Sequence, residues 1–223
     1  MQRAARAGLG AVGAGAAIVL GLDLAYLAEV DPLRRTISEH GIGEHGWLFS
    51  LGVALLAVGS LAIGASLVGR RLTAIRSAGA LGLLAWSAGL LVTAWFPKHD
   101  WSVGPSLSGS IHRVGGIVAF LSLPLAALLI SRPWRRHPEW RGSALAVTVL
   151  GLGSLLWVLG IAGAVVVAER SGLPWWRVMP LGLVERGMAV TEVAALVALG
   201  FWAARREGVR LPRALSGREA VPD

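Results

Sequence analysis

The stretch WLFSLGVALLAVGSLAIGASLV, residues 47–68, decides the fold class because it contains no charged side chain over 22 consecutive positions. About 20 apolar residues are enough to carry an α-helix across a hydrocarbon core of about 30 Å. A helix or strand of a soluble protein would alternate its apolar residues with polar ones. The stretch therefore predicts a transmembrane helix.

Five further stretches of the same kind surround it. We expect an all-α bundle of six transmembrane helices, near residues 7–28, 47–68, 75–95, 111–130, 144–168 and 181–203. The whole chain agrees, since 55% of its residues are hydrophobic and only 15% are charged, against about 25% in soluble domains. Residues 1–204 are expected to form one transmembrane domain, and the polar, basic residues 205–223 a flexible cytoplasmic tail.

The first span could be mistaken for a secretory signal because Arg3 and Arg6 precede it. Its apolar run is longer than the usual signal core of about 7–15 residues. Tyr26 also occupies a position where cleavage after Ala28 would need a small residue. We expect a retained membrane anchor.

The basic residues predict the orientation, because Lys and Arg concentrate on the cytoplasmic side of membrane proteins. Fourteen of the 21 lie near the two termini and near the connections after the second and fourth spans, and seven lie on the other side. Both termini are therefore predicted to be cytoplasmic. The net charge of +8 is then a consequence of topology, and no nucleic-acid partner is expected.

Small residues should supply the surfaces on which these helices pack, because lipid offers no hydrophobic drive for helix association. Candidates include Gly52 with Gly59 and Gly160 with Gly163. Residues 8–13 match the dinucleotide fingerprint G-x-G-x-x-G, but that motif needs a preceding strand, which is not predicted. Eight of the ten tryptophans fall near predicted span ends, where indole rings favour the headgroup region. Trp86 and Trp157 fall inside spans and are expected to pack in the bundle.

The extracytoplasmic side gathers the polar residues that could carry chemistry. After the first span, Asp31 and Pro32 predict the start of a short surface helix that ends at Gly41. We expect a polar pocket there for a lipid or small polar ligand. Its candidate residues are Ser38, Glu39, His40, Asp100, His112 and Arg186.

Two ionisable residues inside predicted spans need an explanation, because a charge in hydrocarbon costs about 2.5–3.5 kcal/mol on insertion scales. They are Asp23 in the first span and Glu192 in the sixth, with Arg186 and Arg113 as the nearest countercharges. One interpretation is a polar clamp that fixes helix pairing. The other is a pair of relay groups for binding or transport, which is the form that the pocket hypothesis takes.

Two alternatives remain open. His40, His99, Asp100 and His112 could bind zinc for a membrane-embedded hydrolase, although the sequence contains no H-E-x-x-H motif. Otherwise no cofactor is predicted. The chain could also be a structural or assembly subunit of a membrane complex. Whether the protein is an enzyme is left open, and membrane lipids are its expected surroundings.

Three passages of the chain resemble a family of prokaryotic multi-pass membrane proteins, domain of unknown function 998. They are residues 31–39, ending in Ser38 and Glu39; Phe96-Pro97-Lys98-His99-Asp100 followed by His112; and residues 182–186, ending in Arg186. The resemblance implies six spans and a multi-pass protein of the prokaryotic cytoplasmic membrane. It implies no defined activity.

Overall fold

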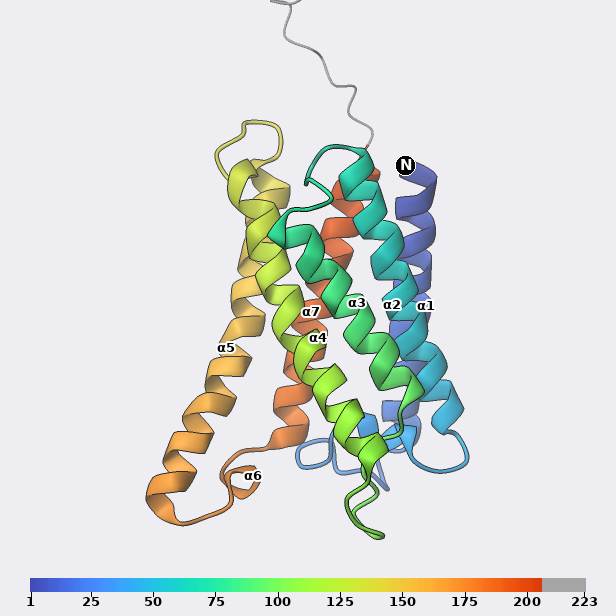
Figure 1. The fold of residues 1–223 in the computed structure, drawn as a ribbon, viewed down its shortest axis with the longest axis vertical. Coiled ribbons are helices and arrows are strands. Elements are labelled where there is room, and N and C mark those ends of the chain that lie inside the picture. Colours follow the sequence, from blue (N-terminus) through green and yellow to red (C-terminus); the bar gives the residue numbers. More distant parts are fainter. Residues whose placement is uncertain (206–223) are drawn as a thin grey trace, which may run out of the picture.

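The computed structural model describes residues 1–205, apart from the side chains of residues 175 and 176, as an all-helical bundle without strands (Figure 1). Six helices are long and apolar enough to span a membrane. They are α1 (Gln2–Ala25), α2 (Gly46–Gly69), α3 (Ala78–Trp95), α4 (Leu107–Ser131), α5 (Arg141–Ser171) and α7 (Leu181–Ala204). Three short helices join them, namely η1 (Ile37–Gly41), η2 (Arg132–Trp134) and α6 (Trp175–Val178).

The six predicted spans are confirmed as helices, with ends within four residues of the prediction at all but one place. Helix α1 begins at Gln2, five residues before the predicted start, because Arg3 and Arg6 are exposed and continue the helix beyond the apolar run. The predicted tail lies almost entirely outside the described residues.

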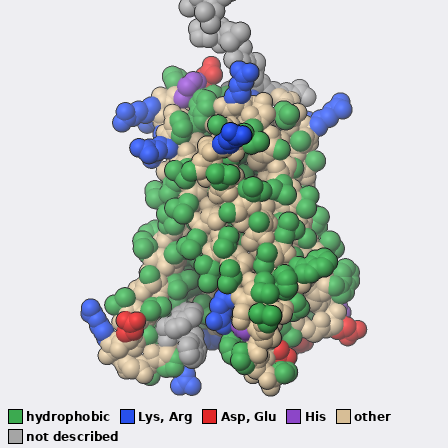
Figure 2. Space-filling view, viewed as in Figure 1, with side chains coloured by type: hydrophobic (Ala, Val, Ile, Leu, Met, Phe, Trp, Pro, Cys, Tyr) green, Lys and Arg blue, Asp and Glu red, His purple; other side chains and the backbone are tan. Residues whose placement is uncertain are grey.

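Helix α7 occupies the centre of the bundle. It contacts α1, α2, α4 and α5, while the other spanning helices follow one another around it as neighbours in sequence. The N-terminus, the connections 70–77 and 132–140, and the end of α7 lie together at one end, called here the arginine end (Figure 1). The connections 26–45, 96–106 and 172–180 lie at the other, called the cap end. Figure 2 shows charged side chains gathered at both ends, with an apolar band between them.

Helices α1 and α2 pack with their backbones in close contact. An added Cβ at Gly59 would lie 2.7 Å from the carbonyl oxygen of Gly8, and one at Gly15 would collide with the carbonyl oxygen of Gly52. The predicted packing role of Gly52 and Gly59 is confirmed. The same prediction for Gly160 and Gly163 is wrong, because an added Cβ at either would meet nothing within 4 Å.

Two tryptophans near span ends were predicted to place their indole rings in the headgroup region, but their rings are buried in the bundle. Trp140 is 8% exposed and Trp202 only 1% exposed, because both rings pack with Trp134 in an aromatic cluster at the arginine end. Trp47, Trp95 and Trp101 are exposed, as predicted. Inside the bundle, Trp86 is buried and its indole N–H donates to Ser60 Oγ at 2.9 Å.

Candidate functional site

An ion pair joins the first spanning helix to the last at the cap end. Arg186 of α7 donates from Nε to Oδ2 of Asp23 in α1 at 2.7 Å, and from Nη2 to Oδ1 of the same carboxylate. His40 of η1 adds a third contact, with its Nε2 at 2.9 Å from Asp23 Oδ1. The three side chains are 17%, 14% and 3% exposed for Asp23, Arg186 and His40. The predicted pairing of Asp23 with Arg186 is confirmed, and Arg113 is exposed elsewhere.

The remaining donors of Arg186 hold the first connection in place. Nη1 donates to the carbonyl oxygens of Pro32 at 2.9 Å, Arg35 at 2.7 Å and Gly182 at 3.1 Å. This approach requires glycine at 182, since an added Cβ would collide with the Arg35 carbonyl oxygen. A planar guanidinium with five donors suits such a site, whereas lysine offers three donors on one atom.

The predicted surface helix is shorter than expected and lies against the bundle. Asp31 does not begin it, because its Oδ1 accepts the N–H of Leu33 in a turn. The helix runs from Ile37 to Gly41 as η1. The Ile37 N–H donates to Oε2 of Glu185 in α7 at 3.0 Å, so the first turn of η1 is bonded directly to the last spanning helix.

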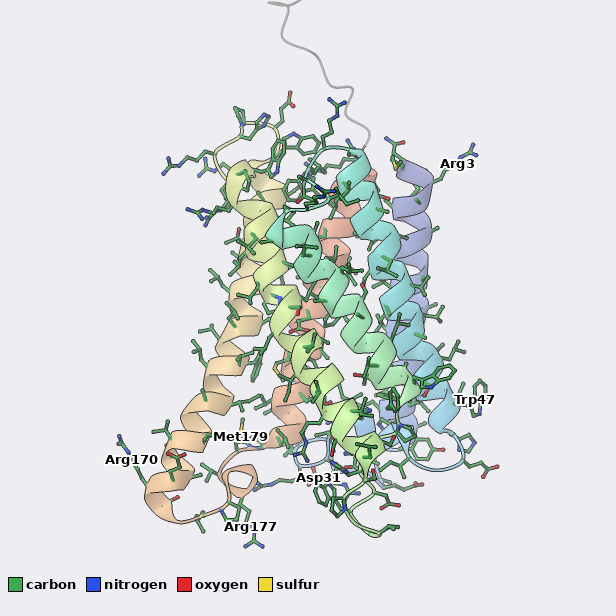
Figure 3. All side chains as sticks on the ribbon, in the orientation of Figure 1. Arg3, Asp31, Trp47, Arg170, Arg177 and Met179 are labelled. Carbon is green, nitrogen blue, oxygen red and sulfur yellow. The ribbon has the colours of Figure 1, made fainter. Side chains whose placement is uncertain are left out.

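A second ion pair joins two connections. Lys98, between α3 and α4, donates from Nζ to Glu39 Oε1 at 2.6 Å and to Thr36 Oγ1 at 2.9 Å. Arg35 donates to the other oxygen of Glu39 at 3.1 Å, and the hydroxyls of Thr36 and Ser38 are 3.1 Å apart. We call the joined set the polar cap, consisting of Asp23, Glu39, His40, Lys98, Glu185 and Arg186. Figure 3 shows these connections at the end of the bundle opposite Arg3.

The other candidate residues make local contacts in the 96–112 region. Asp100 Oδ1 accepts from the hydroxyl of Ser102 at 2.6 Å and from its backbone N–H at 2.9 Å. These hydrogen bonds hold the pKa of Asp100 below its ordinary value. His99 Nδ1 accepts the Ser106 N–H at 2.9 Å, and His112 Nδ1 lies 2.7 Å from the carbonyl oxygen of Phe96. All three therefore shape this connection.

The four proposed zinc ligands do not form a cluster. His40 is bonded to Asp23, whereas His99, Asp100 and His112 each have a different partner. Among residues 1–205 no three His, Cys, Asp or Glu side chains lie close enough to hold a metal ion. The structure thus separates the predicted pocket residues into the polar cap, which includes Glu39, His40 and Arg186, and the local contacts of the connection.

Glu192 lies alone at the middle of the bundle. It is the twelfth of the 24 residues of α7 and its side chain is fully buried. Ser154 of α5 donates to its Oε1 at 2.8 Å, while Oε2 has no hydrogen-bond partner in the described part of the chain. No arginine or lysine forms an ion pair with it there, in contrast to Asp23.

Sequence reasoning missed Lys98, Glu185 and Ser154 as site residues. Lys98 and Glu185 lie next to candidate residues in the passages 96–100 and 182–186, so their position in the sequence could have identified them as site residues. Ser154 gave no such signal, because small hydroxyl residues are common throughout the spans.

The comparison with known proteins agrees with this architecture. No curated protein and no solved structure matches the chain. The model of the family described as protein of unknown function (DUF998) matches residues 9–202, which include four spanning helices in full, most of α1 and α7, the polar cap and Glu192. The chain belongs to this DUF998 family of proteins of unknown function.

Proposed function

We propose that this protein is a membrane carrier for a small polar or lipid ligand, in which Glu192 takes up and releases a proton and the polar cap closes one end of the pathway. The observation that carries the proposal is a fully buried carboxyl group at the centre of a spanning helix, with no ion-pair partner among residues 1–205. Ionisable groups in this position commonly belong to proton or substrate pathways in membrane proteins.

The position of Glu192 supports a role at the membrane midplane. It lies 11 residues from the start of α7 and 12 from its end, or about 17 Å from each at about 1.5 Å per residue. An isolated carboxylate is costly in an apolar interior, and the protonated acid is accommodated more easily. Oε2 can then carry the proton while Oε1 accepts from Ser154. A conformational change that admits water or a cation would favour release of this proton.

The helices around Glu192 contain features suited to movement. One turn from Ser154 along α5, Gly151 packs against α4, where an added Cβ would lie 3.2 Å from the carbonyl oxygen of Pro124. Pro124 has no N–H and therefore leaves the carbonyl of Phe120 without its usual helical donor. Helix α4 is continuous through Pro124, and a missing hydrogen bond of this kind is a usual place for a helix to bend.

The polar cap supplies a closed state for one end. Its bonds connect α1, α7 and two connections through charged side chains rather than through apolar packing. Movement of Arg186 away from Asp23 would remove one set of attachments between the 26–45 connection and α7, since the same guanidinium also holds the carbonyls of Pro32 and Arg35. Opening would also require the bond from the Ile37 N–H to Glu185 to break. Access from the cap end would follow.

A ligand screen at several pH values tests the proposal. The purified full chain is heated with a panel of amino acids, sugars, nucleosides, organic acids, amines and lysophospholipids, because any ligand of the folded state raises its denaturation temperature. We expect at least one stabilising compound. When its binding is coupled to one proton, Kd changes by up to about tenfold per pH unit.

The Glu192→Gln variant should keep the fold and lose that pH dependence. Glu44→Gln, at an exposed carboxylate, is the matched control and should retain it. A ligand whose Kd depends on pH identically in Glu192→Gln would contradict the role of Glu192. A panel without any stabilising compound would contradict ligand binding.

The proposal includes placement in the prokaryotic cytoplasmic membrane with the arginine end inside. The chain has no cysteine, so single cysteines can be introduced without further changes. With an impermeant maleimide on intact cells, Ser102→Cys should be labelled and Arg135→Cys only after lysis. The reverse pattern would invert the orientation, and labelling of both in intact cells would contradict the opposed ends.

A further inference from the structure

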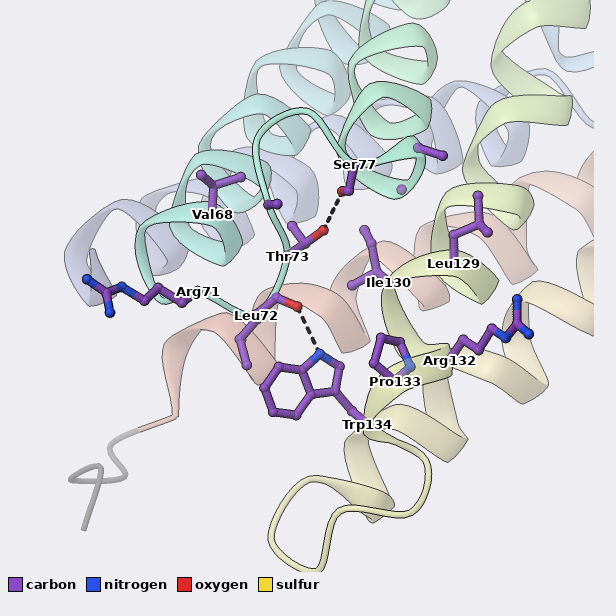
Figure 4. Close-up of a pocket in the computed structure, with 13 residues that line it drawn as sticks. Val68, Arg71, Leu72, Thr73, Ser77, Leu129, Ile130, Arg132, Pro133 and Trp134 are labelled. Atoms are coloured by element: carbon purple, nitrogen blue, oxygen red, sulfur yellow. Dashed lines mark hydrogen bonds between the residues drawn. The ribbon is translucent and has the colours of Figure 1, made fainter. Parts of the chain in front are cut away.

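An open hollow of about 620 Å³ lies at the arginine end, far from the polar cap. The last residues of α2, the 70–77 connection, the start of α3 and the end of α4 with η2 line it. Figure 4 shows Thr73 and Ser77 in the middle of its lining, with Arg71 and Arg132 on opposite sides. The proposed function makes no use of it.

Several neutral donors in the lining suit an anion. Ala78 and Gly79 are the first two residues of α3, and the N–H groups of a first helical turn have no acceptor within the helix. Together with the helix dipole they favour a phosphate or carboxylate. The hydroxyls of Thr73 and Ser77, which are 2.7 Å apart, lie beside them. One of these hydroxyls donates to the other, so one proton of the pair can turn toward a ligand.

The basic side chains continue into a second hollow. It has a volume of about 510 Å³, shares Arg132 and Pro133 with the first, and is lined also by Arg135 and Arg136. With Arg71, the linings of the two neighbouring hollows include four arginines. Basic hollows between spanning helices are typical sites for anionic lipid headgroups.

Arg71 is held in a conformation that favours glycine. Its φ of 57° is the one positive φ of a non-glycine residue in the described chain, and it follows the end of α2, where the Leu72 N–H bonds to the carbonyl of Leu67. Helices often end with glycine at this position, and another residue costs roughly 1–2 kcal/mol there. Arginine therefore occupies this position at a conformational cost.

The rest of the lining is apolar. Leu129 is 43% exposed on α4, beside Ile130 and the ring of Trp134. The Trp134 indole N–H is occupied by the carbonyl oxygen of Leu72 at 2.8 Å, so the ring offers a fixed apolar wall. A free anion would make no use of this wall, whereas the first carbons of an acyl chain would.

We infer that this hollow is a binding site for the phosphate headgroup of an anionic phospholipid in the leaflet at the arginine end. The phosphate lies at the α3 N-terminus and the hydroxyls of Thr73 and Ser77. Arg71 and Arg132 stand on opposite sides of the hollow, and their guanidinium groups, which point outward in Figure 4, turn toward the phosphate when the lipid binds. The acyl chains leave along Leu129.

The test measures the thermal stability of the delipidated full chain in detergent with added phosphatidylglycerol, phosphatidylcholine or glycerol phosphate. We expect phosphatidylglycerol alone to raise the denaturation temperature. In Arg132→Gln with Arg135→Gln its affinity should fall by about fivefold per arginine, or about 30-fold together. Arg3→Gln with Arg6→Gln removes the same charge at the same end outside the hollow and should leave the affinity unchanged.

Arg71→Gly separates folding from binding. Glycine relieves the left-handed strain, so this variant should be as stable as the parent chain without lipid, yet bind phosphatidylglycerol about fivefold more weakly. Equal stabilisation by phosphatidylcholine, or equal stabilisation by glycerol phosphate, would overturn the lipid assignment. Unchanged phosphatidylglycerol affinity in both the Arg132/Arg135 variant and Arg71→Gly would overturn the site.

Discussion

Replacement of Asp23 or Arg186 by alanine should destabilise the protein strongly, and the two losses should not add. Asp23→Ala leaves the guanidinium of Arg186, a side chain only 14% exposed, without its countercharge. Breaking a buried pair by removing one partner costs about 3–5 kcal/mol. Arg186→Ala leaves the Asp23 carboxylate with His40 alone and also removes the bonds to Pro32 and Arg35, so its loss should be at least as large.

The double variant removes both charges and leaves neither unpaired. Two independent losses would sum to about 6–10 kcal/mol, comparable to the whole stability of a typical domain at about 5–15 kcal/mol. Residues in direct contact usually show a coupling of about 0.5–3 kcal/mol. The double variant should therefore lose less than the sum by about that amount, and Arg186→Ala should dominate it.

Reversible unfolding in mixed detergent micelles, followed by tryptophan fluorescence, gives the free energy of unfolding for each variant. Asp23→Ala combined with Arg113→Ala is the matched control, because Arg113 is the exposed alternative countercharge, and its losses should add. Additive losses for Asp23 and Arg186, within about 0.5 kcal/mol, would refute the direct pairing on which the closed cap rests.

Three further predictions concern helix packing, a buried hydrogen bond and the pH dependence of stability. Gly59→Leu should lower the free energy of unfolding by about 1–3 kcal/mol because the new side chain collides with α1. Gly13→Ala is the control, since an added Cβ there meets nothing within 4 Å, and it should raise the free energy of unfolding by up to about 1 kcal/mol. Equal effects of the two substitutions would contradict the packing of α1 against α2. Trp86→Phe should lower it by about 1–3 kcal/mol by removing the buried donor to Ser60, and an unchanged stability would contradict that bond. Because the pKa of Asp100 is lowered in the folded chain, its carboxylate stabilises the fold fully at pH values above the ordinary pKa of 3.8, and this contribution is lost as the pH falls through the lower pKa of the folded state. Asp100→Asn should therefore make the free energy of unfolding less dependent on pH in the acid range. The same acid dependence in the variant and the parent chain would refute this.

The number and position of the spanning helices could be predicted because the hydrocarbon core imposes one length and one polarity on every span. The stretch at residues 47–68 appears as a helix at Gly46–Gly69. Span ends were less predictable, since α1 extends through Arg3 and Arg6 into water, where composition no longer limits the helix. The aromatic cluster of Trp140 and Trp202 was missed because the end position of a tryptophan does not reveal whether a neighbouring helix covers it.

The candidate site could be predicted only in part, because Lys98 and Glu185 were missed and the pairing of Asp23 with Arg186 was the one contact expected. Asp23 and Arg186 are rare charges inside apolar spans, so each needed a partner, and the pairing follows from that cost. The hydrogen-bond partners of the histidines depend on the path that each connection takes. His40 turns inward to Asp23 while His99 and His112 fold onto their own connection, and no spacing in the sequence encodes that difference.

Infrared spectroscopy of the Glu192 carboxyl group tests the carrier proposal most directly. The carbonyl stretch of a protonated carboxylic acid is separate from that of a carboxylate, and the difference between the parent chain and Glu192→Gln isolates this residue. We predict an acid band at neutral pH that disappears in the variant and shifts when Ser154→Ala removes the donor to Oε1. A carboxylate band for Glu192 throughout the neutral range, unaffected by Ser154→Ala, would contradict a buried proton carrier at the centre of α7.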